Sequence, residues 1–197
     1  FENIKGEIKM KRLLLTLSVV LCWLFIHEPL RAADILSFTS SPSSWVGQGR
    51  TLTLTSPTTS FSAYRYFNQG AYTNAVRLTA GDYTLYLVGP GYTLPTEGFY
   101  PNATRWPFME SGAGMAFSGE GRGNNTLTGY FNVLQAVYNS SGNITSFAVD
   151  FMQYDECIQA RWVSGKFRYH SDVPIPEPAS ALLMLLGAAW MGAKRKR

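Results

Sequence analysis

The sequence contains little cysteine and little histidine, two of each in 197 residues. One of each lies near the N-terminus, so residues 33–173 contain only Cys157 and His170. These numbers exclude an intramolecular disulfide and a histidine-rich metal site in this region. A Ser-His-Asp or Cys-His nucleophile system would have to use His170, which we expect at an exposed strand end, where a non-catalytic role is the simpler interpretation. Cys157 can be a buried bystander, a reactive thiol or an intermolecular bridge.

Excess positive charge is also lacking in the central region, although the whole chain has a formal net charge of +4. Five of the 17 Lys and Arg lie within residues 1–32 and four within residues 174–197, which leaves eight for residues 33–173. The same division leaves nine of the 13 Asp and Glu there, a net charge of −1. A nucleic-acid-binding function therefore lacks the basic patch that it needs. Disorder is excluded as well, because 46% of the residues are apolar and 14% aromatic.

Hydrophobic runs are short, and the first lies near the N-terminus at Leu13–Ile26. As a helix this run rises about 21 Å, less than the roughly 30 Å hydrocarbon core of a bilayer. Two bases precede it, and a polar stretch that ends in Leu30-Arg31-Ala32-Ala33 follows it. This order is typical of a secretory signal peptide, which we predict over residues 10–32, with cleavage between Ala32 and Ala33. The Sec export machinery is the expected partner.

Residues 1–9 do not fit this signal peptide. The chain starts with Phe1, and Lys5-Gly6-Glu7 would be encoded by purine-rich codons just upstream of Met10. A bacterial ribosome-binding site has this appearance when it is translated by mistake. We therefore predict that Met10 is the true start and that residues 1–9 are a mistranslated leader.

The second hydrophobic run, Ala179–Ala193, lies near the C-terminus. Proline-rich residues 173–178 precede it, and four bases, Lys194, Arg195, Lys196 and Arg197, follow it. Proline fixes φ and favours an extended linker, so a helix can begin only after Pro178. The run would form a short transmembrane helix, and the terminal bases would hold it with residues 33–173 outside the cytoplasm. An ordinary tail anchor is the alternative interpretation.

The order of elements in residues 174–197 closely resembles the PEP-CTERM protein-sorting signal of Gram-negative bacteria. The residues that carry the resemblance are Pro176, Glu177 and Pro178, the leucine-rich run with Gly187, and the terminal basic cluster. The resemblance implies processing by an exosortase, a transpeptidase-like membrane enzyme of bacteria that produce extracellular polysaccharide. It implies a precursor tethered to the inner membrane and then a protein at the cell surface or outside the cell. The same segment is also catalogued as an ice-binding protein C-terminal domain, a name that does not indicate an activity.

Between the two ends, β-branched and aromatic residues form short runs that Gly, Asn, Ser and Pro interrupt. Alternation with a period of two, as in Thr51–Thr55, predicts β-strands. The expected strands are Ile35–Thr39, Arg50–Ser56, Phe61–Phe67, Ala75–Thr79, Tyr83–Val88, Met115–Gly119, Thr126–Tyr138, Thr145–Tyr154 and Arg161–Tyr169. We therefore predict that residues 33–173 form an all-β domain, an antiparallel β-sandwich of jelly-roll type.

The stretch Thr93–Gly114 interrupts this rhythm with three prolines and four aromatic residues. An irregular stretch of this length is often functional, and the alternative is a compact loop held by its own aromatic side chains.

Four segments of the central region resemble blocks in a group of exported bacterial β proteins that often have PEP-CTERM tails and no named activity. They are Ser44–Gly49, Ala103–Phe108, Gly119–Leu127 and Ala148–Gln153. Members of the group have cysteine at the position of Asn124 and another shortly after the last block, which implies a disulfide. Here Asn124 replaces the first cysteine and Cys157 stands near the second.

Six carboxylates could include a pair for glycoside hydrolysis: Glu97, Glu110, Glu120, Asp150, Asp155 and Glu156. Nothing in their spacing selects a pair, and we expect most of them to be solvated or paired with Arg105, Arg122 or Arg161. The last three could also contribute oxygen ligands to a structural calcium ion, although no EF-hand-like loop is present. We predict no catalytic residue, no cofactor and no other metal.

Tyr64, Tyr66, Trp106 and Trp162 are candidate platforms on which sugar rings could stack, although aromatic residues of β proteins more often lie in the core. Taken together, the sequence predicts a non-enzymatic protein of the cell envelope or extracellular matrix, with a structural or binding role. The alternatives are a polysaccharide-binding module and a carbohydrate-active enzyme.

Overall fold

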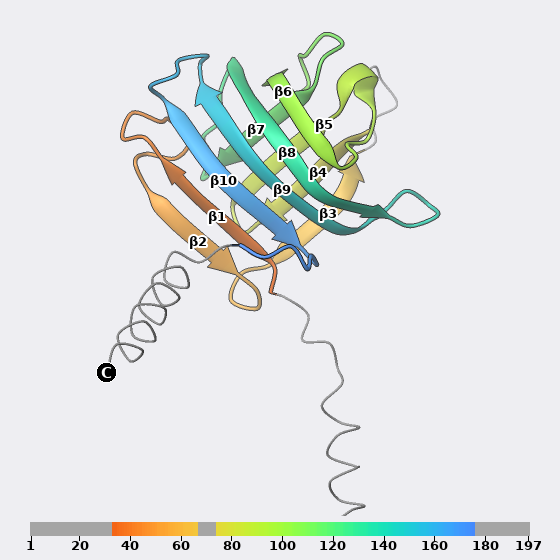
Figure 1. Cartoon of the computed structure of the whole chain (residues 1–197). Coiled ribbons are helices and arrows are strands. Elements are labelled where there is room, and N and C mark those ends of the chain that lie inside the picture. Colours follow the sequence, from red (N-terminus) through yellow and green to blue (C-terminus); the bar gives the residue numbers. More distant parts are fainter. Residues whose placement is uncertain (1–32, 67–73, 176–197) are drawn as a thin grey trace, which may run out of the picture. The chain divides into compact units, whose positions relative to one another are not determined.

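A computed structural model describes residues 33–66 and 74–175 (Figure 1). The chain divides into two compact units, Phe1–Arg31 and Ala32–Arg197, and all described residues belong to the second. The predicted signal peptide and most of the predicted sorting segment lie outside the described residues, together with the helices expected there. Within the described part of the chain, no helix has the length and apolar character needed to cross a membrane.

The described residues form ten strands and one short 3₁₀ helix, η1 (Pro90–Tyr92). The strands are β1 (Ile35–Ser40), β2 (Thr51–Thr55), β3 (Phe61–Tyr66), β4 (Ala75–Ala80), β5 (Tyr83–Val88), β6 (Gly98–Arg105), β7 (Gly114–Gly119), β8 (Leu127–Tyr138), β9 (Ile144–Asp155) and β10 (Trp162–Tyr169). The all-β class is confirmed. Nine of the strands match the nine expected ones to within one residue at each end.

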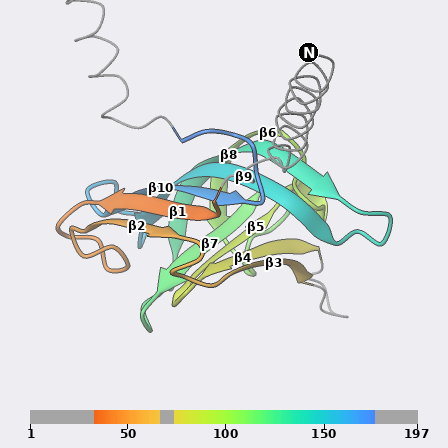
Figure 2. The ribbon, with the colours of Figure 1, turned by 90° about the horizontal axis from the view of Figure 1, so that it is seen from below.

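All ten strands belong to one sheet, in the order β2-β1-β10-β9-β8-β6-β7-β5-β4-β3. Neighbours are antiparallel except β6 and β7, which pair in parallel through Thr104 with Gly114 and Arg105 with Met115. A sandwich would need two separate sheets, whereas here the hydrogen bonding continues from edge to edge. The sheet curls instead, so that β3 contacts β9 and β10 across the interior (Figure 2). Its two halves face each other as the layers of a sandwich do.

The core lies on the inner face of this curled sheet, because the residues pointing inward along each strand are the apolar ones. Phe61 of β3 meets Phe167 of β10 edge to face, with ring centroids 5.7 Å apart. The ring centroids of Phe117 of β7 and Phe151 of β9 lie 4.9 Å apart. These aromatic contacts join strands from opposite halves of the sheet, so burial of the inner face stabilises the curl.

The expected loop Thr93–Gly114 is wrong in part, because it contains β6. The strand was not predicted because it contains Pro101. A proline has no backbone N–H to donate to a neighbouring strand, so its presence argues against a strand in the sequence pattern. The structure accommodates it at a bulge, where the register with β8 shifts between Tyr100 and Ala103 and Asn102 has a φ of +53°. Tyr100 turns inward and stacks on Phe131, with ring centroids 4.6 Å apart. Phe99 points outward and is 60% exposed.

A side chain completes the sheet where β6 turns away from β7 after Arg105. The side-chain amide of Gln153, fully buried in β9, acts there like a peptide group. Its Oε1 accepts the backbone N–H of Phe117 at 2.8 Å, and its Nε2 donates to the carbonyl oxygen of Phe117 at 3.1 Å. The buried N–H and carbonyl groups of Phe117 therefore both have a hydrogen-bonding partner.

Candidate functional site

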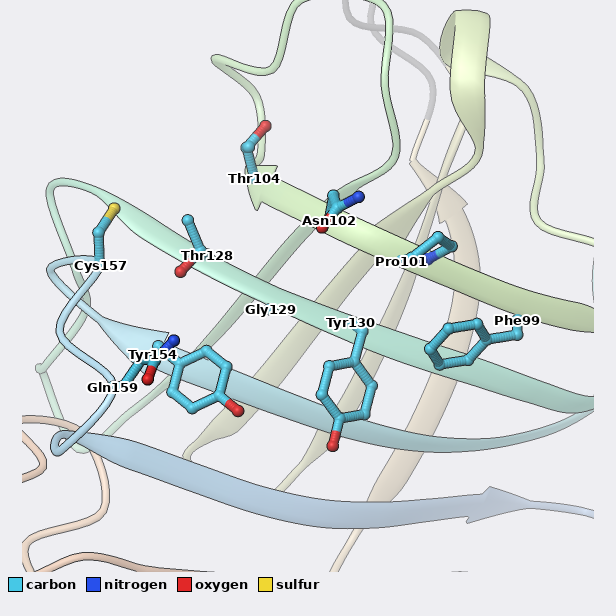
Figure 3. A pocket seen from close by; sticks show the side chains of 10 residues that line it. All are labelled: Phe99, Pro101, Asn102, Thr104, Thr128, Gly129, Tyr130, Tyr154, Cys157 and Gln159. Carbon is cyan, nitrogen blue, oxygen red and sulfur yellow. The ribbon is translucent and has the colours of Figure 1, made fainter.

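The outer face of β8, β9 and β10 presents a row of aromatic and uncharged polar side chains. Alternation along each strand produces it: Tyr130 points outward between the buried Gly129 and Phe131, and Tyr154 between the buried Gln153 and Asp155. Because Tyr154 is paired in register with Trp162 of β10, these two aromatic side chains lie side by side. Figure 3 shows the rings of Tyr130 and Tyr154 standing on this face.

Two open pockets lie along this row. One, of about 380 Å³, is lined by Phe99, Pro101, Asn102, Thr104, Thr128, Gly129, Tyr130, Tyr154, Cys157 and Gln159 (Figure 3). The other, of about 470 Å³, is lined by Thr39, Met152, Tyr154, Gln159, Trp162 and Ser164. Tyr154 and Gln159 belong to both linings, so the two pockets adjoin and form one groove, which we call the outer-face groove. No described residue in either lining carries a charge.

The loop between β9 and β10 supplies Cys157 and Gln159 to the groove. Glu156 anchors this loop, because its carboxylate accepts the backbone N–H of Asn125 at 2.8 Å and the hydroxyl of Thr126 at 2.9 Å. The hydrogen bond from the N–H of Asn125, with smaller contributions from Thr126, lowers the pKa of Glu156 below its usual value. The role of Glu156 is thus to hold the loop that supplies Cys157 and Gln159 to the groove.

Glu120 is held by three side chains away from the groove. Arg50 binds it with two parallel hydrogen bonds of 2.8 and 3.0 Å, Tyr83 donates its hydroxyl at 2.8 Å, and Arg122 lies 2.5 Å away. These donors, that of Arg50 first, lower the pKa of Glu120 from 4.5 to about 2. The arrangement joins the chain before β2 to the turn after β7, which is a structural role.

Replacing Glu120 with glutamine is expected to lower the melting temperature most near neutral pH and less in acid. A depressed pKa in the folded state means that the ionised carboxylate stabilises the fold above the ordinary pKa of 4.5 and loses this effect as the pH falls from about 4.5 towards 2. Melting curves of wild type and Glu120→Gln between about pH 7 and pH 3 test this, with Glu97→Gln as the exposed control. A constant difference over that range would contradict it.

The remaining acids near the groove are also held by separate partners. Asp150 forms an ion pair of 2.7 Å with the buried Arg168, and Asp155 is fully buried among neutral donors. The described residues include no group of three acids, cysteines or histidines that could hold a metal ion. Asp150, Asp155 and Glu156, which were considered as ligands of a structural calcium ion, do not form such a group in this part of the chain. Of the expected partners, Arg122 does pair with one of the candidate acids, Glu120.

Glu97 and Glu110 are exposed and line neither pocket. The structure thus does not bring two of the six candidate acids together across the groove, as glycoside hydrolysis would require.

Of the predicted stacking platforms, Trp162 lines the groove and the other three lie elsewhere. Trp106 packs in a small cluster on the outer face of the other half of the sheet, where it stacks on Tyr86 with ring centroids 4.1 Å apart. Tyr66 meets both rings edge to face, and Tyr64 lies against Arg77. The sequence did not single out Phe99, Tyr130 or Tyr154; their outward positions in the strand alternation are the signal that could have found the last two.

His170 and Cys157 lie apart from each other. The backbone N–H of His170 donates to Oδ1 of Asp34 at 2.6 Å, and this hydrogen bond connects the end of the domain to its beginning. The Nε2 atom of the His170 ring lies 3.8 Å from Oδ2 of the same carboxylate. Cys157 is exposed and forms no disulfide, so the interpretation as a buried bystander is wrong. Asn124, at the position where the resembling group has cysteine, donates to Asp155 at 2.7 Å instead.

Comparisons of the chain with protein-family models, curated proteins and solved structures gave no match. The sorting motif Pro176, Glu177 and Pro178, the basic residues 194–197 and Ala32 lie outside the described residues, so their roles stay predictions from the sequence.

Proposed function

We propose that residues 33–173 act outside the cytoplasm as a binding domain of the cell envelope or extracellular matrix and catalyse no reaction. The proposal rests on the outer-face groove, which offers exposed aromatic rings beside hydroxyl and amide groups. Such a surface can hold a ligand by stacking and neutral hydrogen bonds. A purely structural matrix role would not require it.

The surroundings of the acids support the non-catalytic part of the proposal. A general acid or nucleophile needs a carboxylate that faces the substrate and can exchange a proton. Glu120, Asp150 and Glu156 instead hold arginines or backbone groups of the fold. Glu97 and Glu110 line neither pocket.

The two ends of the chain support the location. Residues 10–32 have the pattern of a signal helix for the Sec machinery, and residues 174–197 that of a PEP-CTERM sorting signal with a short membrane helix. We propose that an exosortase-like enzyme processes the tethered precursor in the inner membrane. The protein then reaches the surface, where extracellular polysaccharide is the expected ligand.

One experiment in the host tests location and function together. When the full-length gene is expressed, the processed protein is expected in the extracellular polysaccharide fraction, without release of reducing ends from that polysaccharide. Changing Pro176-Glu177-Pro178 to three alanines should leave an unprocessed precursor in the inner membrane and remove the protein from this fraction. Immunoblots of the fractions and a reducing-end assay on the purified protein are the measurements.

Reducing-end release that disappears in Glu97→Gln or Glu110→Gln would establish an enzyme and overturn the proposal. Unchanged mass and location of the triple-alanine variant would mean that the tail is only an anchor.

A further inference from the structure

We infer that the outer-face groove binds a chain of an uncharged polysaccharide, laid across the strands with its sugar rings stacked on aromatic side chains. The inference rests on the proposed function and names the ligand class of the same site. Four aromatic residues on neighbouring strands would form the platforms: Phe99, Tyr130, Tyr154 and Trp162.

The chemistry of the lining matches that of a sugar. A pyranose ring has an apolar face of C–H groups that stacks on an aromatic ring, and a rim of hydroxyl groups that needs hydrogen-bonding partners. Phe99 and Tyr130, with ring centroids 5.6 Å apart, are 60% and 37% exposed. The amides of Asn102 and Gln159 and several hydroxyl groups stand beside the rings. A single surface therefore offers both kinds of contact.

The size of the groove favours a chain of small units over a protein partner. Pockets of about 380 and 470 Å³ fall in the range typical of small-molecule sites. A stable protein partner would need a buried area of about 1,200 Å² or more around an apolar centre. Here the aromatic rings are interrupted by hydroxyl and amide groups, which suit separate sugar units.

The absence of charge in the described lining determines the kind of polysaccharide. An anionic chain would need cations to replace the water around its carboxylates. Arg105 and Arg161 are next to lining residues in the sequence but belong to neither lining. Lys166 is paired in register with Asp150, Arg168 forms an ion pair with the same carboxylate, and residues 33–173 have a net charge of −1. An uncharged chain loses nothing by the absence of cations, and its binding should resist salt.

The order of the strands determines the direction of the chain. Phe99, Tyr130, Tyr154 and Trp162 come from β6, β8, β9 and β10, which are consecutive neighbours in the sheet. With strands about 4.8 Å apart, the row extends over roughly 15 Å, which is the length of several sugar units. Tyr154 belongs to both pockets and would contact the middle of the chain. Short oligosaccharides should therefore bind much more weakly than polymers.

Calorimetric titration of the full chain in detergent tests this with hydroxyethylcellulose and galactomannan as uncharged probes and alginate as the anionic one. Binding of at least one uncharged probe is expected, with a Kd that changes less than about twofold between low and high salt. Tyr154→Ala and Trp162→Ala should each weaken it by about tenfold or more. Tyr154→Phe keeps the ring and should bind nearly as the wild type does. Phe108→Ala is the matched control, because Phe108 is 64% exposed and lies outside the groove.

The inference is overturned if neither uncharged probe binds, if alginate binds more tightly than both, or if both alanine variants bind like the wild type. Melting curves of the variants separate lost binding from lost folding, and Tyr154→Phe provides the same check within one position. Retention on the host's own polysaccharide without binding of either uncharged probe would overturn this inference and leave the proposed function standing. Release of reducing ends would overturn the proposed function itself.

Discussion

Asp155→Ala is expected to prevent folding of the β domain or to lower its melting temperature by about 10 °C or more. The carboxylate is fully buried. Its Oδ2 accepts the hydroxyl of Ser44 at 2.6 Å and the backbone N–H groups of Trp45 at 2.7 Å and Val46 at 3.3 Å. Its Oδ1 accepts the side-chain amides of Asn124 at 2.7 Å and Gln153 at 3.2 Å.

Removal of this carboxylate would leave several buried donors without an acceptor, and each costs about 1–3 kcal/mol. A total loss of about 4 kcal/mol or more is a large part of the 5–15 kcal/mol by which a typical domain is stable. Asp155→Asn keeps the shape and one acceptor oxygen but turns an amide towards donors, so it should lose less stability than Asp155→Ala.

Urea unfolding followed by tryptophan fluorescence measures both Asp155 variants, with Glu97→Ala as the control for an exposed acid. The control should lie within about 0.5 kcal/mol of the wild type. If Asp155→Ala were as stable as the control, the network would not carry the stability assigned to it.

The strands could be predicted from the sequence because alternation is a local signal. Leu52 and Leu54 turn to the core while Thr51 and Thr53 stay exposed, as the pattern requires. Their arrangement could not be predicted in the same way. Whether strands form two sheets or one curled sheet depends on contacts between distant residues, such as Phe61 with Phe167.

The candidate site was only partly predictable for the same reason. Trp162 and Trp106 were both candidates for stacking on sugar rings in the sequence. The packing of the folded chain distinguishes them, because Trp106 is stacked on Tyr86 whereas Trp162 lines the groove. Tyr154 gains its central place from its register with the strands on both sides. Because β6 was not predicted, owing to Pro101, the outward position of Phe99 on that strand was not predicted either.

Three of the four segments that the sequence analysis singled out supply hydrogen-bond donors to Asp155. Ser44–Gly49 supplies Ser44, Trp45 and Val46, Gly119–Leu127 supplies Asn124, and Ala148–Gln153 supplies Gln153. These segments are joined by a buried network that holds loops of the fold together.

Gln153 connects that network to the backbone of β7, and the need for it follows from the course of β6. Along β7, the carbonyl of Met115 accepts the N–H of Trp106 at 2.9 Å, and Gly119 exchanges two backbone hydrogen bonds with Arg122. Between them, the N–H and carbonyl of Phe117 depend on the side chain of Gln153. Loss of the amide would leave both groups buried and unpaired.

Gln153→Leu is therefore expected to reduce the free energy of unfolding by about 2–4 kcal/mol, because two buried backbone groups lose their partners while the volume of the side chain stays similar. Gln135→Leu is the matched control, since the Gln135 amide is only half-buried and accepts one hydroxyl, that of Ser146, at 2.7 Å. Urea unfolding gives the loss, and hydrogen exchange should show faster exchange at the amide of Phe117 in Gln153→Leu alone. Protection of that amide equal to the wild type would mean that another group, and not Gln153, completes the sheet at this point.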